Sequence, residues 1–182
     1  MKKFALLVFV SISCPLISFS QGEFQQDTLN VDSIYIEKSI DEMTGEIKYA
    51  PNRLLVVTDE TKSKGFGVGC WVDKKFSFYG MYTKSFNIGN CHENDEIIIL
   101  FENGMKITKK SWKGFNCEGV GYFNMNDMEQ DLLSKVPVSK IRITNGRSRD
   151  SYTADIPNKD KRYFIQLFYA INNRLATEKN SQ

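Results

Sequence analysis

Apolar and polar side chains alternate along much of the chain, which is the pattern of half-buried β-strands. The clearest case is the segment 138–144, where Ile141 and Ile143 point to one face and Arg142 to the other. Ile34 and Ile36 belong to the same kind of alternation near the N-terminus. By this criterion we expect strands at 31–36, 53–58, 122–125, 138–144 and 152–156, and two hairpins within 65–84 and 95–110.

Two segments follow the three-to-four-residue period of an amphipathic helix instead. The first is predicted at 126–136, because Asn126 and Glu129 have the spacing of a capping box and Pro137 follows the last turn. The second is predicted at about 158–176. Their apolar stripes are Met128, Leu132, Leu133 and Val136 in the first helix, and Phe164, Leu167, Phe168, Ile171 and Leu175 in the second.

These elements predict a single α+β domain over residues 31–176, with a mostly antiparallel β-sheet and two packing helices. Residues 177–182 are expected to form a frayed tail. The 182-residue chain is 41% hydrophobic and 13% aromatic, which excludes a disordered protein and suits one domain with a sizeable core.

Glycine is unusually frequent in the first hairpin, where Gly65, Gly67 and Gly69 share one face. A three-residue turn would place Cys70 opposite Phe78, and Gly69 opposite Tyr79. Large side chains would then cover the bare glycine backbone, which we favour over a smooth face that admits a ligand. The spacing is not that of the G-x-G-x-x-G phosphate loop, so a dinucleotide site is excluded.

The second hairpin has the strongest local signal, the pair Asn103-Gly104 between two strand-like runs. This pair is typical of a two-residue type I′ turn, which would place Leu100 opposite Ile107. The strand 97–101 is apolar on both faces, so we expect a central strand that is covered on both sides.

The first 20 residues have the composition of a secretory signal peptide, with Lys2 and Lys3 before a short apolar run. Small residues at Ser18 and Ser20 place the cleavage before Gln21, and 21–30 is expected to be a flexible arm. The alternative is a lipoprotein acylated at Cys14, although its motif lacks the usual aliphatic residue. No later segment reaches membrane-spanning length. We therefore expect an exported protein, in the periplasm or outside the cell.

The net charge of +2 belongs to this leader, because it contains two of the 24 basic residues and none of the 22 acidic ones. A mature chain with balanced charge gives no electrostatic reason to expect nucleic acid as a partner.

Three cysteines remain after the leader: Cys70, Cys91 and Cys117. The register of the second hairpin, continued outward, places residue 91 opposite 116, so Cys91 and Cys117 come within reach of a disulfide. A bulge near Ser111-Trp112 would shift this register. The pairings 70–91 and 70–117 remain open, and the expected arrangement leaves Cys70 as a core thiol.

Candidate catalytic groups are few, because His92 is the only histidine. It would have to serve any Cys–His or Ser–His–Asp scheme, and the sequence has no nucleophile-elbow motif. Neighbouring side chains on a strand point apart, which argues against a dyad with Cys91. The acidic pairs Asp59-Glu60 and Glu93-Asp95-Glu96 are better explained as solubilising turns. We therefore expect no catalytic residue, metal site or cofactor.

Two basic clusters are candidates for binding an anion or a partner, because Lys and Arg attract acidic groups. Solvated strand faces are the simpler explanation of both. The expected function is a non-catalytic binding or interaction module for a protein or an anionic glycan. The alternatives are an exported hydrolase that uses an Asp/Glu pair and an inhibitor of an envelope enzyme. The clusters are Lys106, Lys109, Lys110 and Lys113, and the more interesting Lys140, Arg142, Arg147 and Arg149.

Overall fold

A computed structural model describes residues 34–73, 78–89, 91–112 and 114–179. The predicted signal peptide, the arm and Cys14 lie outside these residues. In the described part the chain is mostly antiparallel β-sheet with two helices, which confirms the predicted α+β class. The elements are β1 (Ile36–Ile40), β2 (Ile47–Pro51), β3 (Leu55–Thr58), β4 (Gly65–Asp73), β5 (Phe78–Phe86), β6 (Glu96–Phe101), β7 (Lys106–Lys110), β8 (Val120–Asn124), α1 (Asp127–Lys135), β9 (Val138–Thr144), β10 (Ser151–Asp155) and α2 (Tyr163–Lys179).

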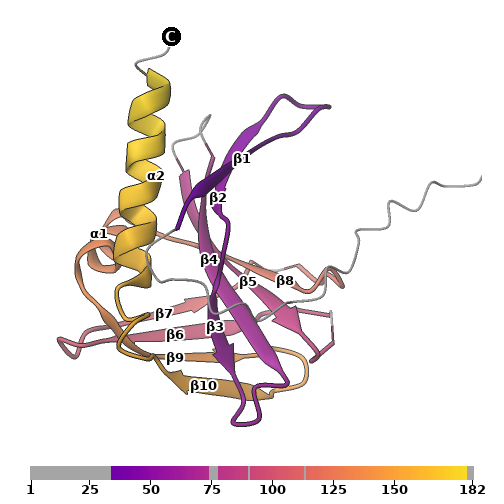
Figure 1. Cartoon of the computed structure of the whole chain (residues 1–182). Helices are drawn as coiled ribbons and strands as arrows, with labels where there is room; N and C mark the ends of the chain where they lie inside the picture. Colours follow the sequence, from indigo (N-terminus) through magenta and orange to yellow (C-terminus); the bar gives the residue numbers. More distant parts are fainter. Residues whose placement is uncertain (1–33, 74–77, 90, 113, 180–182) are drawn as a thin grey trace, which may run out of the picture.

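The strands divide into two sheets. The first has the order β1-β2-β4-β5-β8, with β3 pairing onto β4, and the second has the order β10-β9-β6-β7. Figure 1 shows the two sheets crossing, with α1 and α2 on the same side of the molecule and the β1–β2 hairpin reaching away from it. None of the helices in the described part of the chain is long and apolar enough to cross a membrane.

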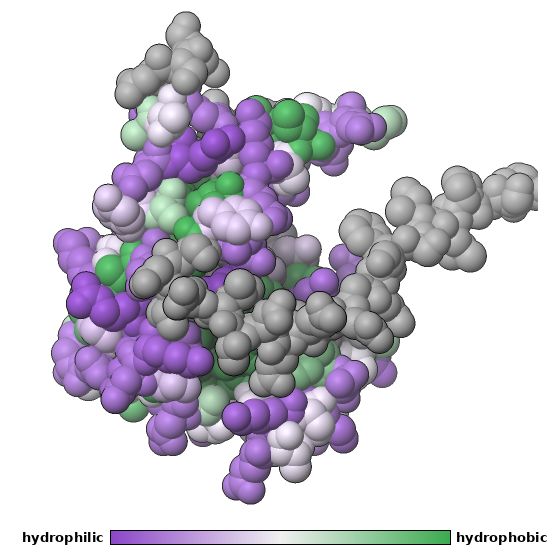
Figure 2. Space-filling model, in the orientation of Figure 1, coloured by the Kyte–Doolittle hydropathy of each residue, from purple (hydrophilic) through white to green (hydrophobic). Residues whose placement is uncertain are grey.

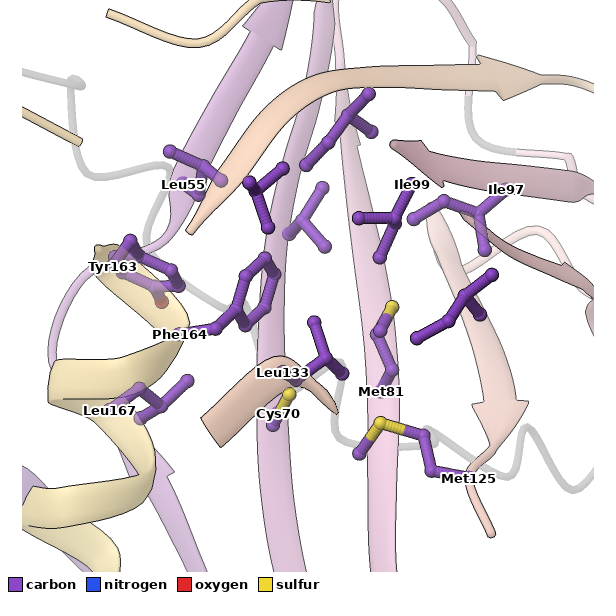
Figure 3. Close-up of a cluster of buried hydrophobic side chains, with 14 of the residues drawn as sticks. Leu55, Cys70, Met81, Ile97, Ile99, Met125, Leu133, Tyr163, Phe164 and Leu167 are labelled. Carbon is purple, nitrogen blue, oxygen red and sulfur yellow. The ribbon is translucent and has the colours of Figure 1, made fainter. Parts of the chain in front are cut away.

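The core lies where the inner faces of the sheets meet the helices (Figure 3). Cys70 and Met81 enter it from the first sheet, Ile99 from the second, and Leu133 and Leu167 from the helices, all with no exposed surface. Burial raises the pKa of the Cys70 thiol far above its usual value, so this cysteine is the inert core thiol that the sequence predicts. Hydrophilic residues cover much of the visible surface in Figure 2, with an apolar area over the projecting hairpin, where Ile40 and Met43 are exposed.

The β4–β5 hairpin forms, but the predicted register is wrong. Cys70 pairs with Met81 and Gly69 with Tyr82, because four residues rather than three separate the last pair, Asp73 and Phe78. The glycines are nevertheless covered by large neighbours, as expected. A Cβ added to Gly69 would lie 2.7 Å from the Leu54 side chain and 3.1 Å from the Tyr82 ring. This face is therefore packed and does not admit a ligand.

The pairing register of the β6–β7 hairpin differs by one residue from the predicted register. Three residues form its turn, with a hydrogen bond of 2.9 Å from Phe101 N to Met105 O, and only Gly104 takes a positive φ, of 82°. Ile107 consequently pairs with Ile99 and joins the buried face. A one-residue slip turns every side chain of a strand over, and here it removes Ile107 from water while Met105 stays exposed.

Strand β6 is central in its sheet, between β9 and β7, as predicted. The prediction that both of its faces are buried is wrong. Its inner face is fully buried at Ile97 and Ile99, whereas Leu100 on the other face is 37% exposed. Strand β9 confirms the predicted alternation, since Ile141 and Ile143 are buried and Arg142 is exposed.

Both helices form close to their predicted positions. The capping box of α1 is present: the Asn126 side chain accepts from Glu129 N, and the Glu129 side chain accepts from Asn126 N. Leu133 is buried as predicted, but Met128 is 80% exposed, because the short helix buries a narrower stripe than the sequence indicates.

Helix α2 begins at Tyr163, five residues after the predicted start. Residues 157–161 form a turn instead, in which Asp160 N and Lys161 N both donate to Pro157 O. The predicted stripe is confirmed, since Phe164, Leu167, Phe168 and Ile171 are buried and Leu175 is packed against the core. The helix continues to Lys179, within the segment expected as a tail.

Candidate functional site

The disulfide between Cys91 and Cys117 lies beside a group of buried polar side chains, His92, Asp95, Ser111 and Asn145. His92 and Asn116 form a bridged pair beside it, with His92 N donating to Asn116 O at 2.8 Å and Asn116 N to His92 O at 3.1 Å. Cys91 therefore lies opposite Cys117 in a non-hydrogen-bonded pair, where antiparallel backbones approach most closely. The predicted pairing of these cysteines is confirmed, one residue beyond the expected register.

A row of three buried or half-buried polar side chains lies next to the disulfide. His92 Nδ1 is 2.5 Å from Asp95 Oδ2, and His92 Nε2 is 3.1 Å from Ser85 Oγ. His92 is 1% exposed and Asp95 is fully buried. The order of groups is that of a Ser–His–Asp triad, which the sequence analysis did not find.

The environment of Ser85 indicates that these three side chains stabilise the fold and do not form a catalytic triad. Ser85 pairs with Phe66 across β4 and β5, so both side chains lie on the inner face of the sheet. The Phe66 ring packs edge-on against His92, with ring centroids 5.9 Å apart. The Ser85 hydroxyl donates to Gly89 O at 3.0 Å, so its proton points away from the imidazole that would have to accept it.

Asp95 connects the row to two other segments. Its Oδ1 accepts from Gly146 N at 2.9 Å, in the β9–β10 loop, and its own N–H donates to Ser111 Oγ at 2.9 Å, just after β7. A buried carboxylate needs such donors, because an unpaired charge in the interior is costly. One residue, through its side chain and its backbone N–H, thus connects the segments of His92, Gly146 and Ser111 at this end of the molecule.

An open pocket of about 120 Å³ lies against this network, and we call it the aromatic pocket. Its buried lining residues are His92, Ser111 and Gly121. Its outer lining includes Trp112, which is 48% exposed, Phe115, which is 57% exposed, and Tyr122. The Trp112 and Tyr122 rings lie 5.5 Å apart at an angle of 31°.

The polar groups of the pocket are few. Burial raises the pKa of the Tyr122 hydroxyl, and the nearby Glu118 carboxylate raises it further, so Tyr122 stays a neutral donor at physiological pH. Both imidazole nitrogens of His92 are engaged within the row, which leaves the Ser111 hydroxyl as the polar group on the buried lining. A mostly apolar wall with few polar groups is the usual composition of a ligand site.

The four basic residues singled out from the sequence do not gather at one place. The Arg147 guanidinium packs over the Phe115 ring, with its carbon 4.9 Å from the ring centroid, at the edge of the aromatic pocket. Arg149 lies exposed in the same loop. Arg142 lies on the outer face of the second sheet, and Lys140 forms an ion pair of 2.9 Å with Asp155.

The other basic cluster separates in the same way. Lys109 forms a 3.0 Å ion pair with Glu129 of α1, whereas Lys106 and Lys110 are exposed on the outer side of β7. Lys113 lies outside the described residues. The β6 pairings place Lys106 and Lys140 on either side of Leu100, so members of both clusters share one sheet face.

The acidic pairs are dispersed by the fold. Asp59 closes a turn, where hydrogen bonds from Thr61, Lys64 and Ser63 lower the pKa of its carboxyl group. Asp95 is paired with His92, while Glu93 is exposed. Within the described ranges, no group of three His, Cys, Asp or Glu side chains could hold a metal ion.

Sequence reasoning missed both the polar row and the aromatic pocket. The available signals were the His92-x-x-Asp95 spacing in a turn and two aromatic residues, Trp112 and Phe115, in a segment without strand alternation. Neither identifies Ser85 or Gly146, which come from distant segments.

The geometry defines a small α+β domain with a disulfide-braced aromatic pocket. Comparisons of the chain with protein-family models, with curated proteins and with solved structures found no match.

Proposed function

We propose that the protein is an exported, non-catalytic carbohydrate-binding module, and that the aromatic pocket is its binding site. The observation that carries this proposal is the exposure of Trp112 and Phe115 over a floor that the disulfide and the His92–Asp95 pair hold rigid. Large exposed aromatic side chains are costly in water unless a ligand covers them. The apolar face of a sugar ring is such a cover.

The size and chemistry of the pocket suit one sugar ring. A closed cavity of about 150 Å³ holds a molecule as large as benzene. The aromatic pocket is smaller, at about 120 Å³, but it is open, so it accepts the face of one six-membered ring with the substituents outside. Aromatic faces would stack on the C–H groups of the ring. The hydroxyls of Ser111 and Tyr122 would bond to the hydroxyls of the sugar.

A peptide is less well accommodated at this site. Strand addition requires a free sheet edge, and β8 is an edge strand of the first sheet. However, Trp112 N already donates to Tyr122 O at 2.8 Å, which occupies the β8 edge beside the pocket. A compact ring therefore fits the pocket better than an extended chain.

Export is supported by the basic, apolar leader and by the Cys91–Cys117 disulfide, because disulfides persist mainly in oxidising compartments. Glycans are abundant in those compartments, so the location and the pocket chemistry agree. Lipid attachment at Cys14 would anchor the same module to a membrane and would not change its site.

Trp112→Ala is expected to weaken binding about tenfold or more, since a buried stacking contact of roughly 1.4 kcal/mol corresponds to that factor. The measurement is affinity electrophoresis and calorimetry of the protein without residues 1–20 against a panel of purified polysaccharides. Tyr169→Ala is the matched control, because Tyr169 is 70% exposed on α2 and should bind like the wild type. Equal binding by the Trp112 variant, or binding to no polysaccharide, would reject the proposed function.

The second candidate is an esterase or amidase that uses the Ser85–His92–Asp95 row, and the row's hydrogen bonds favour it. A nucleophilic Ser85 would be labelled by a fluorophosphonate probe, and Ser85→Ala would abolish the labelling. We expect no labelling of the native protein, because the Ser85 side chain faces the interior. Labelling at Ser85 by mass spectrometry would establish the enzyme instead.

A further inference from the structure

We propose that the sugar bound in the aromatic pocket is an acidic one, and that its carboxylate pairs with Arg147. This inference rests on the proposed carbohydrate binding and names the class of glycan. The inference depends on the position of one charged side chain, Arg147, beside the pocket.

Arg147 is the cation that the fold directs to the pocket. Its guanidinium lies 4.9 Å from the centroid of Phe115, a residue of the pocket lining. Stacking on a ring occupies the face of the guanidinium and leaves its N–H edge available for a bidentate pair with a carboxylate. The side chain thus presents two donors next to the place where a sugar ring would stack.

The charge of Arg147 is not neutralised within the described part of the protein, where it has no ion pair. Lys109, Lys140 and Lys161 have acidic partners, Glu129, Asp155 and Glu102, whereas Arg142 and Arg149 have none in the described part, like Arg147. Among these unpaired arginines, Arg147 is the one whose guanidinium packs on an aromatic ring of the pocket. An anionic ligand would complete its charge pairing.

The backbone that carries Arg147 is held in advance of binding. Arg147 N donates to the Asn145 side chain at 2.9 Å, and the preceding Gly146 N donates to Asp95 Oδ1 at 2.9 Å. A side chain at position 146 would not fit, since its Cβ would lie 1.9 Å from Glu93 O. The carboxylate that orients His92 on the pocket floor therefore also fixes the loop of Arg147. Such preorganisation reduces the entropy lost on binding.

The geometry of an acidic sugar matches this arrangement. In a uronic acid the carboxylate is attached directly to the pyranose ring, so one sugar unit carries both a stacking face and a charge. Ring stacking on the aromatic walls and pairing with Arg147 can then be satisfied by a single unit. A neutral sugar would use only the first of these contacts.

The test compares acidic polysaccharides with their own neutral derivatives. Polygalacturonate, alginate and hyaluronan would each be measured beside the carboxyl-reduced polymer, by calorimetry at low and physiological salt. We expect binding to at least one acidic polymer, at least tenfold tighter than to its reduced form. Arg147→Gln should abolish that preference, so that the acidic polymer and its reduced form bind to the variant with affinities within twofold of each other.

Arg149→Gln is the matched control, because Arg149 is an exposed arginine two residues along the same loop. It should keep the preference for the acidic polymer within twofold. If neutral and acidic forms bind equally and both require Trp112, the acidic-sugar inference is wrong and the carbohydrate-binding function stands. If no polymer of the panel binds, both the inference and the proposed function are rejected.

Discussion

Asp95→Ala is expected to destabilise the domain by about 3–5 kcal/mol, the usual cost of removing one partner from a buried, hydrogen-bonded polar network that includes a carboxylate. Asp95 is fully buried and accepts hydrogen bonds from His92 and from Gly146 N, so its loss leaves both donors unpaired in the interior. The measurement is urea unfolding of the protein without residues 1–20 at pH 7, followed by circular dichroism. The thermal midpoint should fall by roughly 6–20 °C.

Two comparisons separate this effect from a general loss of charge. Asp155→Ala removes an 82% exposed carboxylate that pairs with Lys140, and should change the unfolding free energy by less than about 0.5 kcal/mol. In a double-mutant cycle, Asp95→Ala and His92→Ala should be non-additive by about 1 kcal/mol or more, because they remove the same contact. Additive effects, or an Asp95→Ala variant as stable as the wild type, would contradict the structural role of the row.

Local patterns were sufficient for most elements of this fold, but not for the β1–β2 hairpin. The strand predicted at 31–36 is wrong, since β1 spans Ile36–Ile40, and β2, at Ile47–Pro51, was not predicted. The alternation of Ile141 and Ile143 with Arg142 locates β9 with its observed bounds, and the Asn126–Glu129 capping box locates the start of α1. Both signals are complete within a few residues of sequence, because the interactions behind them are local.

Hairpin registers were less predictable, because they depend on the turn that the folded chain selects. The Asn103-Gly104 pair is typical of a two-residue turn, yet a three-residue turn allows Ile107 to be buried beside Ile99. The gain from burying one isoleucine, roughly 2 kcal/mol, is larger than the usual difference between turn types. Tertiary packing therefore decided the register.

The candidate site was the least predictable part, because its contacts join distant segments. Ser85 meets His92 from β5, and Gly146 meets Asp95 across 51 residues of sequence. The Arg147–Phe115 contact joins two loops, neither of which contains a recognisable motif. By contrast, the Cys91–Cys117 pairing could be anticipated, because both cysteines lie on the continuation of one hairpin.

Breaking that disulfide is the second large effect we expect. Cys91 and Cys117 are 26 residues apart, and closing a loop of this length in the unfolded chain stabilises the native state by about 3 kcal/mol in the chain-entropy model. The double variant Cys91→Ser with Cys117→Ser should therefore lose about this much in urea unfolding. The wild type in dithiothreitol should fall to the same value.

Cys70 serves as an internal control for the disulfide measurement. It is fully buried, and its raised pKa keeps it a thiol, so a thiol reagent should react with it only after unfolding. Dithiothreitol should destabilise the wild type and leave the double serine variant unchanged, since the variant has no disulfide to reduce. Sensitivity of the variant to dithiothreitol would show that Cys70 had taken part in a disulfide bond, which would contradict the observed pairing.

Reduction of the disulfide should also weaken glycan binding, because His92 and Asn116 of the pocket adjoin the two cysteines. The binding measurement uses a protein concentration and a temperature at which the reduced domain is still folded.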